Sequence, residues 1–235
     1  MRDLTTIGFD ADDTLWHHER HYQLTQERLA QVLEHWADPD HLAERLLEAE
    51  RRNIRHYGFG VKGFTLSMIE TAIEVTEGRV PAPVISQILE AGRALHSHPI
   101  ELMPHAREAV TALATDHRVV LITKGDLFDQ ERKLAQSGLG DLFDAVEVVS
   151  DKTLETYATV FARHGDGPGR AVMVGNSLKS DILPALEAGA WGIHVPSGYD
   201  WSLDHAERPE GAARFHEITG LDQLCDLIGE LKAAD

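Results

Sequence analysis

From about residue 104 onward, predicted helices alternate with short runs of apolar and β-branched residues, and this alternation constrains the fold more than any other feature. The runs are Val119–Ile122, Val146–Val149, Ala171–Val174 and Trp191–Val195. A helix between successive strands is typical of βαβ units, because parallel neighbours need a long crossover connection. The sequence therefore predicts an α/β protein with a Rossmann-like, mostly parallel sheet, closed by an amphipathic helix near residues 221–231.

A further apolar run, Ile7–Phe9, comes before this region and ends in three carboxylates within four residues, Asp10, Asp12 and Asp13. A buried strand would place them at its carboxyl end, where open α/β sheets keep their chemistry. Clustered carboxylates repel one another unless a cation neutralises them, and hard oxygen ligands favour Mg²⁺. The alternative is a surface turn in which Asp13 and Thr14 cap a helix.

Between the first run and residue 100 the sequence has helical periodicity and no convincing strand. Leu24, Leu29 and Leu33 recur at helical spacing, and breaks at Pro39 and Gly78 separate further amphipathic segments. We therefore expect an inserted all-helical cap domain over residues 16–99. Residues 1–15 and 100–235 would form the α/β core.

Two features of this insertion have competing interpretations. The basic residues Arg51, Arg52, Arg55 and His56 lie within two helical turns, either as a solvated face with Glu partners or, as we expect for Arg52 and Arg55, facing a substrate. The segment Gly58–Gly63 matches G-x-G-x-x-G, but no strand precedes it, so we interpret it as a loop between helices.

Composition excludes several classes of protein. A formal net charge of −17 disfavours binding to nucleic acid and to anionic membranes. No apolar run approaches the ~18 residues of a membrane span, and the N-terminus lacks the layout of a secretory signal. The single cysteine, Cys225, excludes an internal disulfide. We expect a cytoplasmic monomer or homodimer that acts on a small molecule.

Polar side chains follow four of the predicted strands. They are Asp10 and Asp12, Thr123 and Lys124, Lys152, and Asn176 with Asp181. Since the carboxyl ends of parallel strands share one edge of a sheet, these groups would meet in one crevice. Carboxylates, a hydroxyl and a cation suit phosphoryl transfer, which needs in-line positioning and neutralised phosphoryl oxygens.

These residues resemble the four motifs of the haloacid dehalogenase (HAD) superfamily of hydrolases. Asp10-x-Asp12-x-Thr14 is similar to the first motif and Thr123 to the second. Lys152 is similar to the third motif, and Gly175-Asn176-Ser177 with Asp181 to the fourth. The insertion resembles the cap of the helical-cap branch, so the resemblance covers essentially the whole chain.

The resemblance implies a phosphatase of small phosphorylated metabolites, similar to phosphoglycolate phosphatase. Asp10 would attack phosphorus and form an aspartyl-phosphate, and Asp12 would protonate the leaving alcohol and then activate water. Thr123 and Lys152 would hold the phosphoryl oxygens, with Lys124 as a less favoured ligand. Mg²⁺ would be bound by Asp10, the Asp12 carbonyl and Asp181.

The chain departs from the family pattern at two positions. Many members have an acidic residue where this chain has Asn176, and the step from Asn176 to Asp181 is five residues where four are common, so we place Asn176 below Asp181 as a metal ligand. Lys152 lacks the proline that often follows it. The alternative interpretation gives these residues structural roles alone. Lys152 would then be a surface lysine that precedes a helix, and Thr123 and Asp181 would stabilise helix N-termini.

Other activities remain open. Dehalogenation needs no acid for an alcohol leaving group, so Asp12 argues against it. A phosphonate hydrolase would use a cap lysine, for which Lys62 is the one candidate between residues 15 and 100. A phosphomutase, or a non-catalytic binding protein that keeps the fold, is also compatible with the sequence.

Overall fold

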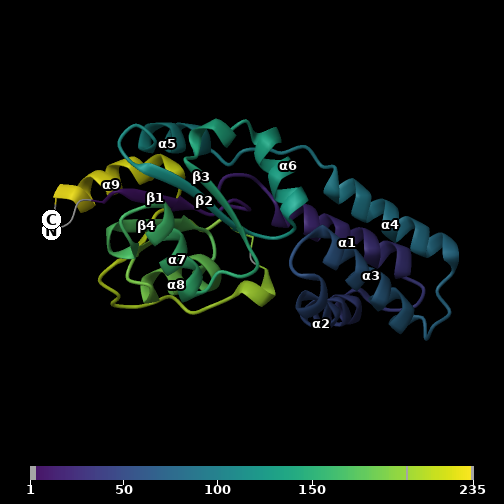
Figure 1. The fold of residues 1–235 in the computed structure, drawn as a ribbon. Coiled ribbons are helices and arrows are strands. Elements are labelled where there is room, and N and C mark those ends of the chain that lie inside the picture. The colour runs from purple at the N-terminus through teal and green to yellow at the C-terminus, as the bar shows by residue number, and fades with distance from the viewer. Residues whose placement is uncertain (1–3, 200, 234–235) are drawn as a thin grey trace. The chain divides into compact units, whose positions relative to one another are not determined.

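Six parallel strands, in the order β3-β2-β1-β4-β5-β6, form the central sheet of the computed structural model, which describes residues 4–199 and 201–233 (Figure 1). The strands are β1 (Thr6–Phe9), β2 (Arg118–Lys124), β3 (Ala145–Val149), β4 (Ala171–Gly175), β5 (Trp191–His194) and β6 (Phe215–Glu217). Every pairing is parallel, so all six carboxyl ends share one edge. The predicted fold class, a Rossmann-like parallel sheet with an inserted helical region, is confirmed.

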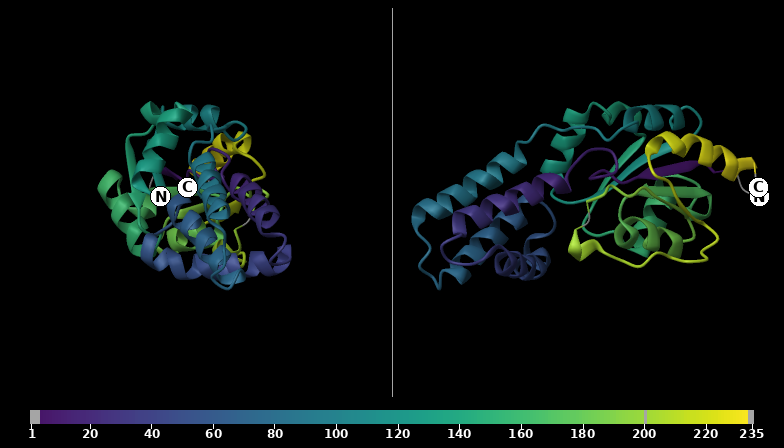
Figure 2. Two further views of the ribbon diagram at one scale, coloured as in Figure 1. Left: turned by 90° about the vertical axis from the view of Figure 1, so that its right-hand side faces the viewer. Right: turned by 180° about the vertical axis from the view of Figure 1, so that it is seen from behind.

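Helices cover both faces of this sheet. They are α5 (Ala106–Leu113), α6 (Leu127–Ser137), α7 (Leu154–His164), α8 (Leu183–Glu187) and α9 (Leu224–Ala233). One core cluster joins α5 and α9 to the sheet, and another joins α7 and α8 to its opposite face. Figure 2 (right) shows the sheet from behind, with α5 in teal and α9 in yellow on one side and α7 and α8 in green on the other.

The alternation of side chains along β1 explains how one short strand serves both faces. Ile7 and Phe9 are fully buried in the cluster that includes α5 and α9. Gly8, between them, faces the opposite side of the sheet. Phe161 of α7 lies so close there that a Cβ on Gly8 would be 3.1 Å from its ring. Burial on both faces explains why the strand is a continuous apolar run.

The chain divides into two compact units. The α/β unit comprises Met1–Glu19, Ile100–Lys124 and Gln130–Asp235, and the helical unit comprises Arg20–Pro99 and Gly125–Asp129. The division passes through α6, so the first turn of that helix belongs to the helical unit and the rest to the α/β unit. Sequence reasoning did not anticipate this division.

Four helices form the helical unit: α1 (Glu19–Leu33), α2 (Pro39–Tyr57), α3 (Val61–Val75) and α4 (Ala82–His96). Asp38 begins α2 as an N-cap whose carboxylate accepts from His41 N–H at 3.0 Å, and Pro39 follows it at the first helical position. The apolar faces of the four helices meet in a core that includes Leu33, Leu46 and Met68.

Three details differ from the sequence prediction. Strand β6 was not predicted, because three residues carry too little periodicity. The closing segment begins as a 3₁₀ turn, Leu221–Gln223, before α9. Helix α3 begins at Val61, so Gly58 and Gly60 lie in the loop with positive φ but Gly63 is helical.

No helix in the described part of the chain combines the length and apolar character that a membrane crossing requires.

Further 3₁₀ turns lie at Gly140–Leu142, Pro168–Arg170 and Ser202–Asp204.

Candidate active site

The carboxyl ends of β1, β2 and β4 lie side by side, because β1 pairs with β2 on one side and with β4 on the other. Phe9 at the end of β1 is in register with Leu121 and Val174. The chain continues from β1 into Asp10, whose backbone N–H still donates to Val174 O at 2.9 Å. The sheet therefore brings the residues that follow these three strands to one edge, where such sheets bind ligands.

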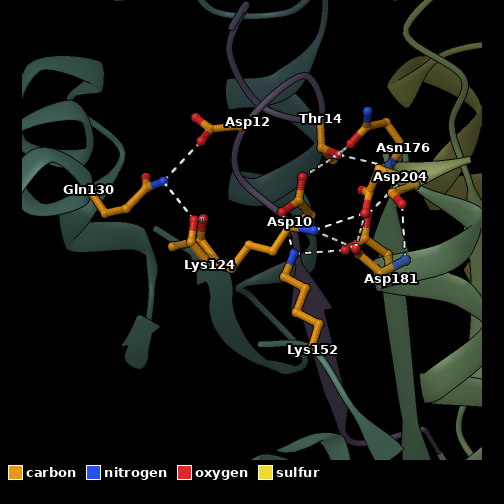
Figure 3. A network of polar contacts seen from close by, with 12 residues as sticks. Asp10, Asp12, Thr14, Lys124, Gln130, Lys152, Asn176, Asp181 and Asp204 are labelled. Carbon is orange, nitrogen blue, oxygen red and sulfur yellow. Dashed lines mark hydrogen bonds and ion pairs between the residues drawn. The ribbon is translucent and has the colours of Figure 1, made fainter. Parts of the chain in front are cut away.

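Lys152 lies between two buried carboxylates at this edge (Figure 3). Its ammonium donates to Asp10 Oδ1 and, at 2.7 Å, to Asp181 Oδ1. The side chains of Lys152 and Asp181 are each 1% exposed and that of Asp10 is 8% exposed. Two ionised carboxylates and one ammonium would leave this group with a net negative charge, which is costly away from water.

The ionisation of this group follows from its burial. Burial and the charge of Asp181 raise the pKa of Asp10 to about 7, although Lys152 opposes the shift. Burial acts to lower the pKa of Lys152, but the two carboxylates outweigh it and raise that pKa. Lys152 therefore stays charged, while Asp10 exchanges its proton near neutral pH. A cation beside Asp10 would favour the ionised form that a nucleophile needs.

The Asn176 amide faces two oxygen atoms of the loop after β1. One atom of this amide lies 3.3 Å from Asp10 Oδ2 and 3.1 Å from the Asp12 carbonyl oxygen. With its NH₂ group turned there, the amide donates to both oxygens. With its own oxygen turned there, three oxygen atoms face one another, as they would around a cation. Only in that second orientation would Asp10, the Asp12 carbonyl and Asn176 offer three oxygen donors to a cation such as Mg²⁺, so metal ligation by Asn176 stays a prediction.

Thr14 links the Asp10 carboxylate to the backbone of Asn176. Its hydroxyl donates to Asp10 Oδ2 at 3.0 Å and accepts from the Asn176 backbone N–H at 3.0 Å. The neighbouring Asp13 accepts from the backbone N–H groups of His18 and Glu19, so it shapes the turn into α1. These contacts combine the two interpretations of the stretch, because the turn-shaping residues also hold the site together.

Asp181, predicted as a metal ligand, has both of its oxygens engaged. Oδ1 accepts from Lys152, and Oδ2 accepts from the Ser177 N–H at 2.9 Å. Among the residues that the structure describes, no three His, Cys, Asp or Glu side chains are placed to hold a metal ion. A metal here would therefore depend on the Asp12 carbonyl and the Asn176 amide, and direct ligation by Asp181 stays a prediction.

A π-helical turn over Leu178–Ile182 accommodates the five-residue step from Asn176 to Asp181. Ser177 O accepts from the N–H groups four and five residues further on, at 2.9 and 3.2 Å. A π turn holds one residue more than an α-helical turn. The extra residue is taken up there, and the Asp181 carboxylate still reaches the lysine.

The Asp12 carboxylate is turned toward Gln130 of α6 (Figure 3). It accepts from Lys133 Nζ at 2.7 and 2.8 Å, from Gln130 Nε2 at 2.9 Å and from Trp16 Nε1 at 2.7 Å. Burial favours protonation of Asp12, but the positive charges of His18 and Lys133 and the hydrogen bonds outweigh it and hold its pKa well below the usual value. Asp12 is therefore ionised in this arrangement, and its predicted role as the acid for the leaving alcohol stays a prediction.

Thr123 and Lys124 end β2 with different surroundings. The Thr123 hydroxyl is buried and, within the described residues, makes one long contact of 3.5 Å with the Lys124 carbonyl, so it is available to a ligand. The Lys124 ammonium donates to Ser180 Oγ at 2.6 Å and to Asp204 Oδ1 at 2.9 Å. Lys124 would therefore have to exchange partners to bind a phosphoryl group.

Arg52 and Arg55, the predicted substrate-facing arginines, lie on α2 of the helical unit. Arg52 donates to Glu70 of α3 through Nε at 3.1 Å and Nη2 at 2.8 Å, and Asn53 donates to the same carboxylate at 2.7 Å. Arg55 is exposed. The structure thus gives Arg52 a role in joining α2 to α3, and a substrate-facing role for either arginine stays a prediction.

The model of the haloacid dehalogenase-like hydrolase family matches residues 4–189, which include β1, β2 and β4 as well as Asp10, Lys152 and Asp181. This chain belongs to the haloacid dehalogenase-like hydrolases. The family suggested by the four motifs is therefore confirmed.

Solved and curated relatives of this haloacid dehalogenase-like hydrolase agree with the family. The crystal structure of a haloacid dehalogenase-like family hydrolase from Xanthomonas campestris is 44% identical, with a TM-score of 0.87 and coverage of 98% of this chain and 93% of that chain. Glyceraldehyde 3-phosphate phosphatase of Methanothermobacter thermautotrophicus is 32% identical over 47% of this chain and 50% of its own length. Pyrimidine 5'-nucleotidase YjjG of Escherichia coli is 28% identical over 54% and 56%. The matches thus span about half the length of these two curated relatives.

Sequence reasoning missed Gln130 and Lys133 of this haloacid dehalogenase-like hydrolase. The local sequence carries no signal for them, and the structure shows α6 with reversed polarity: Leu127 and Phe128 are 58% and 64% exposed while both polar residues are buried. Two polar residues three apart share one side of a helix, so their burial implies a polar partner on that side. That partner is Asp12.

Proposed function

We propose that this hydrolase is a Mg²⁺-dependent phosphatase that releases phosphate from small phosphate monoesters through an aspartyl-phosphate at Asp10. The observation that carries the proposal is the placement of Asp10 at the carboxyl end of β1, in contact with a buried ammonium and within 3.3 Å of the Asn176 amide. A carboxylate held this way is oriented for attack on phosphorus. The two curated relatives, a phosphatase and a nucleotidase, support the same reaction class.

The side chains around Asp10 suit the charge that develops during phosphoryl transfer. Lys152 is ionised and buried, so its charge is weakly screened and can neutralise phosphoryl oxygens. The buried Thr123 hydroxyl is available as a donor to one of those oxygens. When bound by Asp10, the Asp12 carbonyl and Asn176, Mg²⁺ would offset the negative charge of the phosphoryl group.

Asp12 supplies the proton transfers in this proposal. Its ionised carboxylate can accept a proton from water in the second step, which frees Asp10 from phosphate. The proton that Asp12 takes from this water is the one that it donates to the leaving alcohol in the first step of the next turnover. The presence of Asp12 two residues after Asp10 favours phosphate ester hydrolysis over dehalogenation, which needs no such acid.

We propose further that residues 16–99, which include most of the helical unit, form a cap domain that selects the substrate. The exposed Arg55, together with Arg52, would contribute positive charge to an anionic substrate. Lys62 forms an ion pair of 2.8 Å with Asp126, which argues against its use as a Schiff-base lysine. Phosphonate hydrolysis is accordingly the weaker alternative.

A phosphate-release screen tests the proposed function. The panel includes phosphoglycolate, glyceraldehyde 3-phosphate and pyrimidine 5'-nucleotides, each with Mg²⁺ and with a chelator, for the wild type and Asp10→Asn. We expect release that the chelator suppresses and that Asp10→Asn abolishes. Undiminished release by Asp10→Asn, or indifference to the chelator, would refute the mechanism. Halide release from haloacids without phosphate release would favour a dehalogenase.

The contribution of the arginines is tested separately with Arg52→Ala and Arg55→Ala. Arg79, an exposed arginine after α3 that pairs with Glu77, provides the matched control Arg79→Ala. We expect KM for the best substrate to rise in at least one of the α2 variants and to stay unchanged in the control. Unchanged turnover of every substrate by both α2 variants would show that these arginines do not face the substrate.

A further inference from the structure

The Asp12 carboxylate is saturated with hydrogen bonds. Its Oδ1 accepts from Lys133 Nζ at 2.7 Å and from Trp16 Nε1 at 2.7 Å, and its Oδ2 accepts from Lys133 Nζ at 2.8 Å and from Gln130 Nε2 at 2.9 Å. His18 Nδ1 lies 3.5 Å from Oδ1. An ionised carboxylate has about four lone-pair positions, so these contacts occupy all of them.

Saturation has a direct consequence for the proton transfers proposed for Asp12. A base must have a free lone pair to accept a proton, and an acid must direct its O–H at the leaving group. Neither is possible while Lys133, Gln130 and Trp16 together occupy both oxygens. At least one of these donors must release Asp12 before a proton can move.

The surroundings of Gln130 fix its side-chain amide in the orientation that donates to Asp12. Its Nε2 donates to Asp12 Oδ2 and also, at 3.1 Å, to the Lys124 carbonyl oxygen. The opposite amide orientation would direct Oε1 at these two acceptors. Oε1 is instead buried with no hydrogen-bond partner among the described residues, a cost that the two donated bonds must offset.

Burial also holds the Lys133 ammonium against the Asp12 carboxylate. Its side chain is 4% exposed, and it is bound to both oxygens of a carboxylate that is itself 18% exposed. It lies one helical turn after Gln130, so α6 directs both donors to the same side. A helix holds two such groups more rigidly than a loop would, so both donors are kept in place against one carboxylate.

We propose that Gln130 and Lys133 are positioning residues that hold the Asp12 carboxylate at a fixed place and orientation for its part in the reaction. This inference rests on the proposed phosphatase function. Both residues donate hydrogen bonds to the Asp12 carboxylate, so each is proposed to act on the reaction through Asp12. The loss of either should therefore affect substrates in proportion to their need for a proton on the leaving group.

The test compares two phosphate esters that differ in this need. Glycerol 2-phosphate has a basic alkoxide leaving group that requires protonation, whereas p-nitrophenyl phosphate has a stable leaving group that does not. The variants are Lys133→Met and Gln130→Leu, with Arg132→Met, which removes a charge from the same helix, as the matched control. The parameter is kcat/KM, because it reports the first phosphoryl transfer, and thermal melts verify that each variant is folded.

We expect Lys133→Met to lower kcat/KM for glycerol 2-phosphate about tenfold or more and to change that for p-nitrophenyl phosphate by less than about threefold. Gln130→Leu should produce a smaller loss with the same selectivity, since it removes one of four hydrogen bonds. Arg132→Met should resemble the wild type on both esters. Equal losses on the two esters, a gain on glycerol 2-phosphate, or no change would overturn the proposal.

A spectroscopic measurement separates this proposal from the function on which it rests. The chain has four tryptophans, so the indole N–H region of a ¹H–¹⁵N spectrum is simple, and Trp16→Phe identifies the signal of Trp16. This N–H donates to Asp12, so Lys133→Met should move its signal and Arg132→Met should not. Failure of wild-type phosphate release would refute the function, whereas an unmoved Trp16 signal in Lys133→Met would refute the positioning of Asp12 by Lys133.

Discussion

The buried negative charge at Asp10 predicts that the metal-free protein gains stability when this residue is replaced by Asn. The carboxyl has a pKa of 3.8 in the unfolded chain and of about 7 in the folded one. Between these values the folded state holds a proton that the unfolded state has released, so stability falls as pH rises from 4 toward 7. Asp10→Asn removes this loss, and the Asn oxygen can still accept from Lys152.

The magnitude follows from the size of the pKa rise. A rise of about three units at about 1.4 kcal/mol per unit corresponds to about 4 kcal/mol at pH 8. At pH 6, where folded Asp10 is still largely protonated but the unfolded residue is ionised, the same relation yields about 3 kcal/mol. The variant should therefore be more stable than the wild type at both pH values, and its advantage should grow by about 1 kcal/mol from pH 6 to pH 8.

Urea unfolding in EDTA at pH 6, 7 and 8 measures these differences. Repeating the series with Mg²⁺ provides the control, because a bound cation stabilises the folded wild type by mass action and binds the variant less well. The advantage of Asp10→Asn should then shrink or reverse. A variant that is less stable than the wild type in EDTA at pH 8, or an advantage that does not change with pH, would refute the assigned ionisation of Asp10.

Three further predictions concern buried contacts, two beside Asp10 and one in the helical unit. Lys152→Met leaves two buried carboxylates without their cation, so urea unfolding should show a loss of about 3–5 kcal/mol at pH 8; a change below about 1 kcal/mol would contradict the buried pairing. Gly175→Ala places a methyl group against the Asp181 carboxylate, and a Mg²⁺ titration of phosphate release should show a kcat loss of about tenfold or more; wild-type kcat and metal dependence would mean that Asp181 has no strict position. Gly92→Ala drives a methyl into the Thr65 side chain between α4 and α3, so the unfolding free energy should fall by about 1–3 kcal/mol with kcat unchanged. Combining it with Thr65→Ala should recover the loss, and a double variant as unstable as the single one would point to another cause.

The residues at the strand ends were predictable because the signals that place them are local. An apolar run predicts a buried strand, parallel pairing follows from the intervening helices, and the edge then collects Asp10, Thr123 and Lys152 without any knowledge of side-chain positions. The ionisation of Asp12 was not predictable in this way. It depends on Lys133, which is 121 residues away in the chain and resembles any helix-surface lysine until burial is known.

Lys124 illustrates a second limit of sequence reasoning. Its position after Thr123 predicts a cation near the phosphoryl site, but its partner Asp204 is in a 3₁₀ turn eighty residues further on. Nothing in the local pattern of that turn indicates a contact with β2. Pairings between distant loops depend on the packing of the whole sheet, which is why the location of a charged group was predictable but its availability was not.

The π turn between β4 and α8 has a consequence for how relatives of this chain are identified. Sequence patterns count residues between motif positions, whereas the site depends on where a carboxylate arrives in space. An insertion of one residue after Ser177 changes the count but, through the wider turn, keeps Asp181 against Lys152. A pattern search with fixed spacing would therefore reject chains that retain the site. A pattern that allows a step of either four or five residues between these two motif positions would recover them.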